Sequence, residues 1–287
     1  MLNILKYDLY RITKAKVTKI TLLLVALFAI MRVFGLQSNI NQAREYRNEP
    51  KIYKNFIKSS KNNIYDISIT MDYDEDILAE KRKATITDLF FSDIQSRMML
   101  MFLTIFVAFF VGSEWISGFI KNISRRLKDR GLLVISKAVS VGGFLFAIFL
   151  TYYIISGIFC YFVFGYCQLG INFTNLAQLL IQYLLHFSFG IFIMWITYLV
   201  KSMAISIAIG AMLTMNVLAL FYSKIDFLIK KVFNHFTTIM EYTLTGNIAF
   251  LNISAPFHVY LRALLVSVFF FGFFLYLSYL FVKKNEI

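Results

Sequence analysis

Apolar runs of about twenty residues recur along this 287-residue chain, and they constrain its fold more than any other feature. Hydrophobic residues make up 59% of the sequence and charged residues 16%, whereas soluble domains are less apolar and more highly charged. This composition excludes a disordered chain or a nucleic-acid-binding tail, and it argues against a soluble enzyme of two domains. Only two prolines and thirteen glycines are present for tight turns. We therefore expect the elements that cross the bilayer to be helices rather than strands of a barrel.

Hydropathy along the chain predicts six membrane spans. Their expected ranges are 17–36, 98–111, 138–166, 176–200, 203–221 and 259–282. The second span is short, so its helix should begin earlier, near Thr85, and the third is long enough to tilt or protrude. Lys19 and Arg32 lie near the two ends of the first span, where their side chains can snorkel toward water. The expected fold is an all-α integral membrane protein.

Residues 1–16 have the pattern of an amphipathic helix. Leu2, Leu5, Leu9 and Ile12 recur at helical spacing, with charged residues between them. Such a helix lies in the membrane interface with its basic side chains among lipid headgroups. A plain basic tail is the alternative interpretation.

Two longer polar segments separate the spans. Residues 37–97 carry ten Lys or Arg and ten Asp or Glu, and a segment of this length needs structure of its own. We expect it to form a small, mainly helical external domain. In the second segment, 222–258, apolar residues follow helical spacing at Ile225, Leu228, Val232, Phe236 and Ile239. This pattern predicts a helix at the outer leaflet, with an ordinary structured loop as the alternative.

The positions of the lysines and arginines predict the topology. Fourteen lie in residues 1–19, the loop 112–137, Lys201 and the carboxyl-terminal tail, whereas the loop 167–175 has none. Lys and Arg accumulate on the cytoplasmic side of short loops. Both termini are therefore expected inside, and 37–97 and 222–258 outside.

Sequence motifs for metal binding, nucleotide binding and catalysis are incomplete or absent in this chain. An EF-hand loop beginning at Asp72 would need glycine and glutamate where Ile77 and Lys83 stand. The sequence holds no P-loop motif for ATP. His186 lacks the partners of a catalytic site and is expected to form an interhelical hydrogen bond. We therefore expect no enzyme activity, no metal and no cofactor in this chain.

The cytoplasmic loop 112–137 is the most informative stretch. Trp115, Ile116, Phe119, Ile120 and Ile123 share one helical face, which predicts a short amphipathic helix just beneath the membrane. A helix that only fixes the loop to the interface is the structural alternative.

The residues around this helix resemble a motif of the permease subunits of ABC-2-type exporters. The matching residues are Glu114, Gly118, Ile120, Lys121, Asn122, Ser124, Arg125 and Lys137. The motif covers about 114–137, and the expected order of an amino-terminal elbow helix followed by six spans is similar over the whole chain.

The resemblance implies that this loop is a coupling helix that docks on a separate ATPase subunit. The implied coupling residues are Glu114, Trp115, Gly118, Phe119, Ile120, Lys121, Asn122 and Arg125. ATP and Mg would then bind to the dimeric ATPase partner, and a second permease copy or a sister permease would complete the transporter in a bacterial cytoplasmic membrane. Nucleic acid is not an expected partner.

The size of the chain, with its long first outer segment, resembles that of permeases that export antimicrobial or toxic peptides. The resemblance therefore implies an amphipathic peptide as the cargo. Aromatic side chains provide tolerant contacts for such a cargo. The expected path includes Tyr152, Tyr153, Tyr183, His186 and Tyr198. A different interpretation remains open at this point, in which the chain is a membrane sensor or immunity protein that binds a peptide through its external domain without transport.

Overall fold

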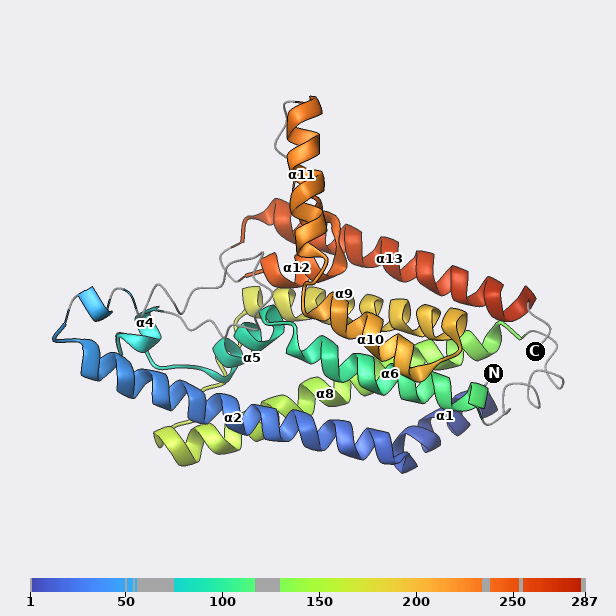
Figure 1. Ribbon diagram of the computed structural model, residues 1–287. Helices are drawn as coiled ribbons and strands as arrows, with labels where there is room; N and C mark the ends of the chain where they lie inside the picture. The colour runs from blue at the N-terminus through green and yellow to red at the C-terminus, as the bar shows by residue number, and fades with distance from the viewer. Residues whose placement is uncertain are drawn as a thin grey trace.

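The computed structural model describes residues 2–49, 51–53, 55, 75–116, 130–233, 238–252 and 255–284, and the regular elements in these ranges are helices. Five helices are long and apolar enough to cross a membrane. They are α2 (Lys16–Tyr46), α6 (Met98–Ile116), α8 (Leu132–Phe164), α9 (Phe173–Val200) and α13 (Phe257–Lys284). The five run side by side in one bundle (Figure 1). The chain is thus an all-α, multi-pass membrane protein.

The predicted fifth span does not form one continuous helix. In its place, α10 (Met203–Thr214) ends before Asn216, which has a left-handed backbone with φ 57°, and α11 (Ala219–Phe233) follows. The 12 residues of α10 rise roughly 18 Å, which is short of a bilayer core. Helix α1 (Leu2–Lys14) and the carboxyl end of α13 nevertheless lie at the same end of the bundle (Figure 1). The chain therefore returns across the bundle between α9 and α13 through several short helices.

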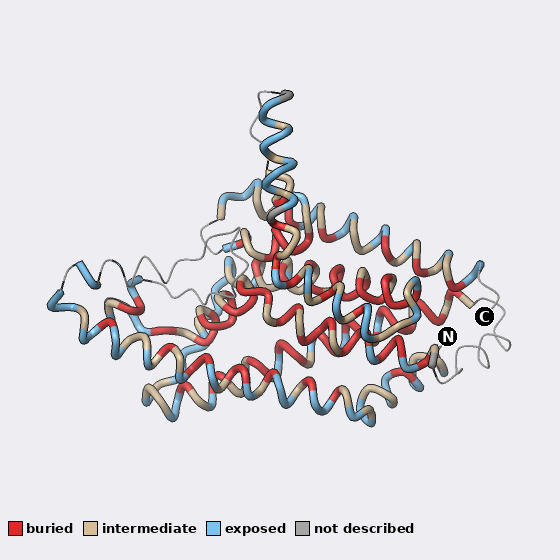
Figure 2. Tube along the Cα trace, in the orientation of Figure 1, coloured by how far each residue is buried: buried red, intermediate tan, exposed pale blue. Residues whose placement is uncertain are grey.

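The helices at the centre of the bundle differ from those at its edges in burial. Buried positions concentrate on α6, α8 and α9, whereas α2 and α13 show many exposed ones (Figure 2). The side chain of Phe269 on α13 is 64% exposed, and Leu23 on α2 is 60% exposed. In a bilayer, close packing rather than hydrophobic burial holds helices together, because the surrounding lipid is itself apolar. The exposed apolar faces of α2 and α13 are therefore suited to contact with lipid or with another chain.

The described part of 37–97 is joined to the bundle. Helix α2 continues ten residues past the predicted end of the first span, and Arg44 near its end forms two hydrogen bonds of 2.7 Å with Glu80. Helix α5 (Ile86–Gln95) begins with a capping box formed by Thr85 and Asp88. It ends before Arg97, so it is separate from α6 rather than its first part. Phe90 of α5 is buried in the main core of the bundle.

The segment 222–258 contains more than the single helix expected from its spacing. Helix α11 projects sideways from the bundle and is exposed along most of its length (Figures 1 and 2). A short 3-10 helix (Ile239–Tyr242) and α12 (Leu244–Phe250) come next. Leu244 and Ile248 of α12 are buried in the main core. The carbonyl of Leu251 accepts hydrogen bonds from Gln178 and Gln182 of α9, so this end of the segment lies inside the bundle.

Candidate functional site

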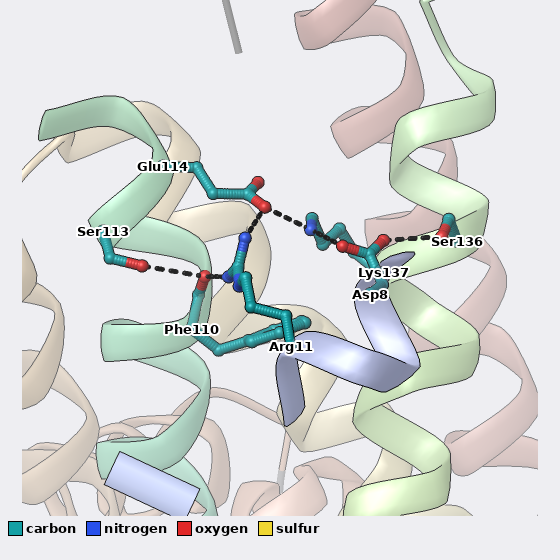
Figure 3. A network of polar contacts seen from close by, with 7 residues as sticks. All are labelled: Asp8, Arg11, Phe110, Ser113, Glu114, Ser136 and Lys137. Carbon is teal, nitrogen blue, oxygen red and sulfur yellow. Dashed lines mark hydrogen bonds and ion pairs between the residues drawn. The ribbon is translucent and has the colours of Figure 1, made fainter. Parts of the chain in front are cut away.

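A cluster of buried charges joins three helices at the end of the bundle where α1 and the carboxyl end of α13 lie (Figures 1 and 3). Lys137, in the second turn of α8, is 2% exposed and donates hydrogen bonds to both Asp8 and Glu114. Asp8 belongs to α1 (Leu2–Lys14), and Glu114 lies near the end of α6. Glu114 also forms an ion pair with Arg11 of α1. The charged groups of Figure 3 therefore alternate in sign, and the two carboxylates share the ammonium group of Lys137.

Polar and aromatic contacts complete the cluster. Ser136 Oγ donates to the second carboxylate oxygen of Asp8 at 2.6 Å. Arg11 donates to the backbone carbonyl of Phe110, and its guanidinium carbon lies 4.2 Å from the centre of the Phe110 ring. Lys137 Nζ lies 4.7 Å from the same ring centre. Phe110 thus contacts both cations, an arrangement favourable to positive charge over an aromatic face.

The four described charges of the cluster balance, since Lys137 and Arg11 are cations and Asp8 and Glu114 are carboxylates. Burial lowers the pKa of Arg11, and the nearby carboxylate of Asp8 opposes that change. A buried charge is tolerable only when it is paired and hydrogen-bonded, and removing one partner of a buried pair costs about 3–5 kcal/mol. These four residues consequently hold α1, α6 and α8 in one fixed arrangement.

The positions of Asp8 and Arg11 correct the expected orientation of the first helix. The sequence places its basic side chains among lipid headgroups, and Lys6 and Lys14 are exposed. Arg11, however, pairs with Glu114, and Asp8 is fully buried. The reason is that Lys137 and Glu114 present complementary charges to that face. Helix α1 therefore turns Asp8 and Arg11 toward α6 and α8, and Ile12 also packs against the main core.

Trp115 contacts other residues of its own chain. Its ring lies 6.2 Å from that of Tyr198 on α9, in an edge-to-face arrangement. Lys201, which ends α9 with a left-handed φ of 54°, places its Nζ 5.0 Å from the Trp115 ring centre. Trp115 thus connects the end of α6 to the end of α9, beside the charged cluster.

The other expected coupling residues lie outside the described ranges. They are Gly118, Phe119, Ile120, Lys121, Asn122 and Arg125. Only the two ends of the loop that carries them, at Ile116 and Arg130, belong to the described part of the chain. The amphipathic helix predicted there remains a prediction.

A second buried ion pair lies toward the opposite end of the bundle. Arg32 of α2 is 1% exposed and pairs with Asp93 of α5. Its Nη2 also donates to Ser92 Oγ at 2.9 Å, and the Tyr152 hydroxyl donates to Asp93. The snorkelling predicted for Arg32 is therefore wrong, because a carboxylate inside the bundle satisfies its charge.

The aromatic residues expected along a substrate path lie in several separate places. Tyr152 belongs to the Arg32 ion pair, and Tyr198 contacts Trp115 at the other end of the bundle. Tyr153 and Tyr183 line a mainly apolar cavity of about 320 Å³ between α5, α8 and α9. His186 is fully buried, with Nδ1 2.7 Å from the carbonyl of Gln182 in its own helix. That bond is local, not between helices as predicted.

The residues that sequence reasoning missed are mainly the partners of buried charges. Asp8 and Asp93 were not singled out, although a lysine at the start of a span and an arginine within one each require a counter-charge. The need for a counter-charge could have indicated that such carboxylates exist. It could not identify them, because Lys137 and Asp8 are 129 residues apart in the sequence and Arg32 and Asp93 are 61 residues apart. Within the described ranges, no group of three His, Cys, Asp or Glu side chains could hold a metal ion.

Comparison with known proteins identifies no family. No family model matches the chain. No curated protein matches it significantly.

Proposed function

We propose that this chain is the transmembrane permease subunit of an ATP-driven ABC exporter of the ABC-2 type. The observation that carries the proposal is the charged cluster of Asp8, Arg11, Glu114 and Lys137. It joins the helices on both sides of the loop 117–129 to the amino-terminal helix. Glu114 and Lys137 are also the two ends of the motif on which the family resemblance rests.

The cluster gives the loop a mechanical role in this proposal. ATP-driven transport requires two global states and an element that biases them from the nucleotide site. A partner ATPase that binds ATP and Mg would push on the loop. Because buried ion pairs join α1, α6 and α8, the displacement would move these three helices together rather than bend the loop alone. The structure supports the rigid joint, and the docking helix itself is inferred from the sequence.

The transporter would contain two permeases, either two copies of this chain or one copy and a sister chain, together with an ATPase dimer. It would lie in the cytoplasmic membrane of a bacterium, with both termini and the loop 117–129 in the cytoplasm. We propose amphipathic or antimicrobial peptides as the cargo. The mainly apolar cavity beside Tyr153 and Tyr183 supports this choice, since it suits an apolar side chain or tail.

The proposal is tested on the loop itself. Phe119→Ala removes an apolar side chain from the predicted docking face, and Gly118→Trp blocks close backbone approach. Both variants should insert and fold normally but fail to co-purify with an ATPase encoded beside this gene and fail to export peptide. Ser38→Ala, at a distant position on α2, is the matched control.

The same experiment separates the proposed exporter from a sensor or immunity protein. A sensor would bind peptide and confer a response without an ATPase, so neither loop variant would alter its function. Normal insertion, normal ATPase capture and normal export by both variants would refute the coupling role.

A further inference from the structure

Arg97 differs from the other buried cations of the bundle. Three cationic side chains are less than a tenth exposed in the described part of the chain: Arg32, Lys137 and Arg97. The first two have carboxylate partners. The guanidinium Nε and Nη1 of Arg97 have no hydrogen-bond partner among the described residues, although Arg97 is only 8% exposed. A buried charge without a counter-ion is strongly unfavourable. Arg97 therefore needs an anionic partner that the described residues do not supply.

The backbone of Arg97 is unfavourable as well. Its φ is 65°, a left-handed conformation that few residues other than glycine adopt. Arg97 occupies the break between α5 and α6, with its N–H bonded to the Ile94 carbonyl and its carbonyl accepting from Leu100. Strained residues of this kind concentrate at ligand sites. Here the strained residue and the unpaired charge are the same residue.

The position of Arg97 along the bundle indicates where a ligand would come from. Helix α6 has 19 residues, so Arg97 lies roughly 28 Å along the helix from the Glu114 end. It therefore sits at the opposite boundary of the apolar layer. The first turn of α6 directly follows it, and the partial positive charge of a helix amino terminus adds to that of the guanidinium.

Helix α10, which packs against α6, carries exposed apolar side chains. Gly210 of α10 packs against Thr104 of α6, and Gly112 packs against Met203, so α6 and α10 are antiparallel. Met212, near the end of α10 on the Arg97 side, is 50% exposed. An amphiphile whose anionic head reached Arg97 could lay its apolar tail along this pair of helices.

We propose that Arg97 is the binding site for the oxyanion headgroup, phosphate or carboxylate, of an amphiphile at this membrane boundary. The guanidinium supplies paired donors in a fork that matches two oxygens of such a group. The anion would supply the counter-charge that the described chain lacks. The headgroup could belong to an anionic lipid or to a free amphiphile that enters from the membrane. The site requires no nucleotide or ATPase, so it stands or falls separately from the proposed transport function.

The binding test uses the purified full chain in phosphatidylcholine nanodiscs. The probes are dodecyl phosphate and dodecanoate, and dodecyltrimethylammonium is the reference with the same tail and opposite charge. Binding is measured as the rise in thermal unfolding midpoint with probe concentration. The two anions should stabilise the wild-type protein, and the cation should not. Arg97→Met should weaken anion binding at least about tenfold, as expected for the loss of a charge-assisted hydrogen bond. Arg97→Lys should retain part of the anion binding. Arg47→Gln, which removes the positive charge of an exposed arginine, should retain all of it.

A second readout distinguishes a ligand site from a structural role. Without anionic probe, Arg97→Met should unfold at or above the wild-type temperature, because it removes an unpaired buried charge. A large loss of stability in phosphatidylcholine would mean that Arg97 has a partner within the chain, and it would overturn the proposal. An anion response that is equal in wild type and Arg97→Met would also overturn it.

The source of the headgroup follows from exchanging the lipid. If nanodiscs of phosphatidylglycerol stabilise the wild type but not Arg97→Met, and added dodecanoate has no further effect, the ligand is a lipid phosphate. If dodecanoate stabilises the wild type equally in both lipids, the ligand is a free amphiphile. Either result supports the site at Arg97.

Discussion

Removing the shared lysine of the charged cluster should destabilise the protein strongly. Lys137→Met keeps the apolar length of the side chain but removes the buried ammonium group that Asp8 and Glu114 share. Breaking a buried pair in this way costs about 3–5 kcal/mol. At roughly 2–4 °C per kcal/mol, the unfolding midpoint should fall by roughly 6–20 °C. The shift is measured by heating the purified protein in nanodiscs and quantifying the remaining folded protein by size-exclusion chromatography.

A second substitution tests whether the loss is electrostatic. Asp8→Asn combined with Lys137→Met restores neutrality, since Arg11 and Glu114 remain paired. The double variant should be more stable than the sum of the two single changes by about 0.5–3 kcal/mol. Lys284→Met, at the exposed end of α13, is the control for loss of a positive charge. Equal midpoints for Lys137→Met and Lys284→Met would refute the reasoning, as would strictly additive losses in the double variant.

Three further predictions concern other parts of the bundle. Arg32→Met leaves a buried carboxylate unpaired and should lower stability by about 3–5 kcal/mol in denaturant titrations; an unchanged midpoint would contradict the pairing. Gly210→Ala places a methyl group 2.3 Å from an α6 side chain and should cost about 1–3 kcal/mol. Gly272→Ala, with no atom within 4 Å of the added carbon, should cost nothing, and equal effects at the two sites would argue against close α6–α10 packing. Cysteines placed at Ser60 and Ser124 should react with an impermeant reagent from opposite sides of intact cells, and labelling of both from outside would overturn the predicted topology.

Hydropathy predicted the existence of the long helices, but not where they end. The apolar run beginning at Val17 identifies α2, yet the helix continues to Tyr46, where Ile40 packs against a small core that includes Ile77 and Arg44 pairs with Glu80. Such contacts have no local signature. Asn216 interrupts the apolar stretch 203–221 with a left-handed backbone, and hydropathy cannot detect that break because the flanking residues stay apolar.

The candidate site was predictable only in part. Glu114 and Lys137 were identified through the family resemblance, and the structure brings their side chains together. Of their partners, Arg11 was assigned to the lipid interface and Asp8 was not singled out, because amphipathic spacing describes one helix and not the charges that face it. A single sequence offers no means of pairing charges that are far apart. The loop 117–129 lies outside the described residues, so its helix still rests on spacing and resemblance.

The most direct test of the account is site-specific photocrosslinking in living cells. A photoreactive amino acid in place of Phe119 should crosslink to the ATPase subunit encoded beside this gene, because the loop is proposed to dock there. The same amino acid in place of Ser60, in the segment predicted to lie outside, should give no such product. A crosslink from position 119 alone is the result that the account predicts. Absence of an ATPase crosslink from position 119, in cells where both proteins are present and the permease is inserted, would contradict it.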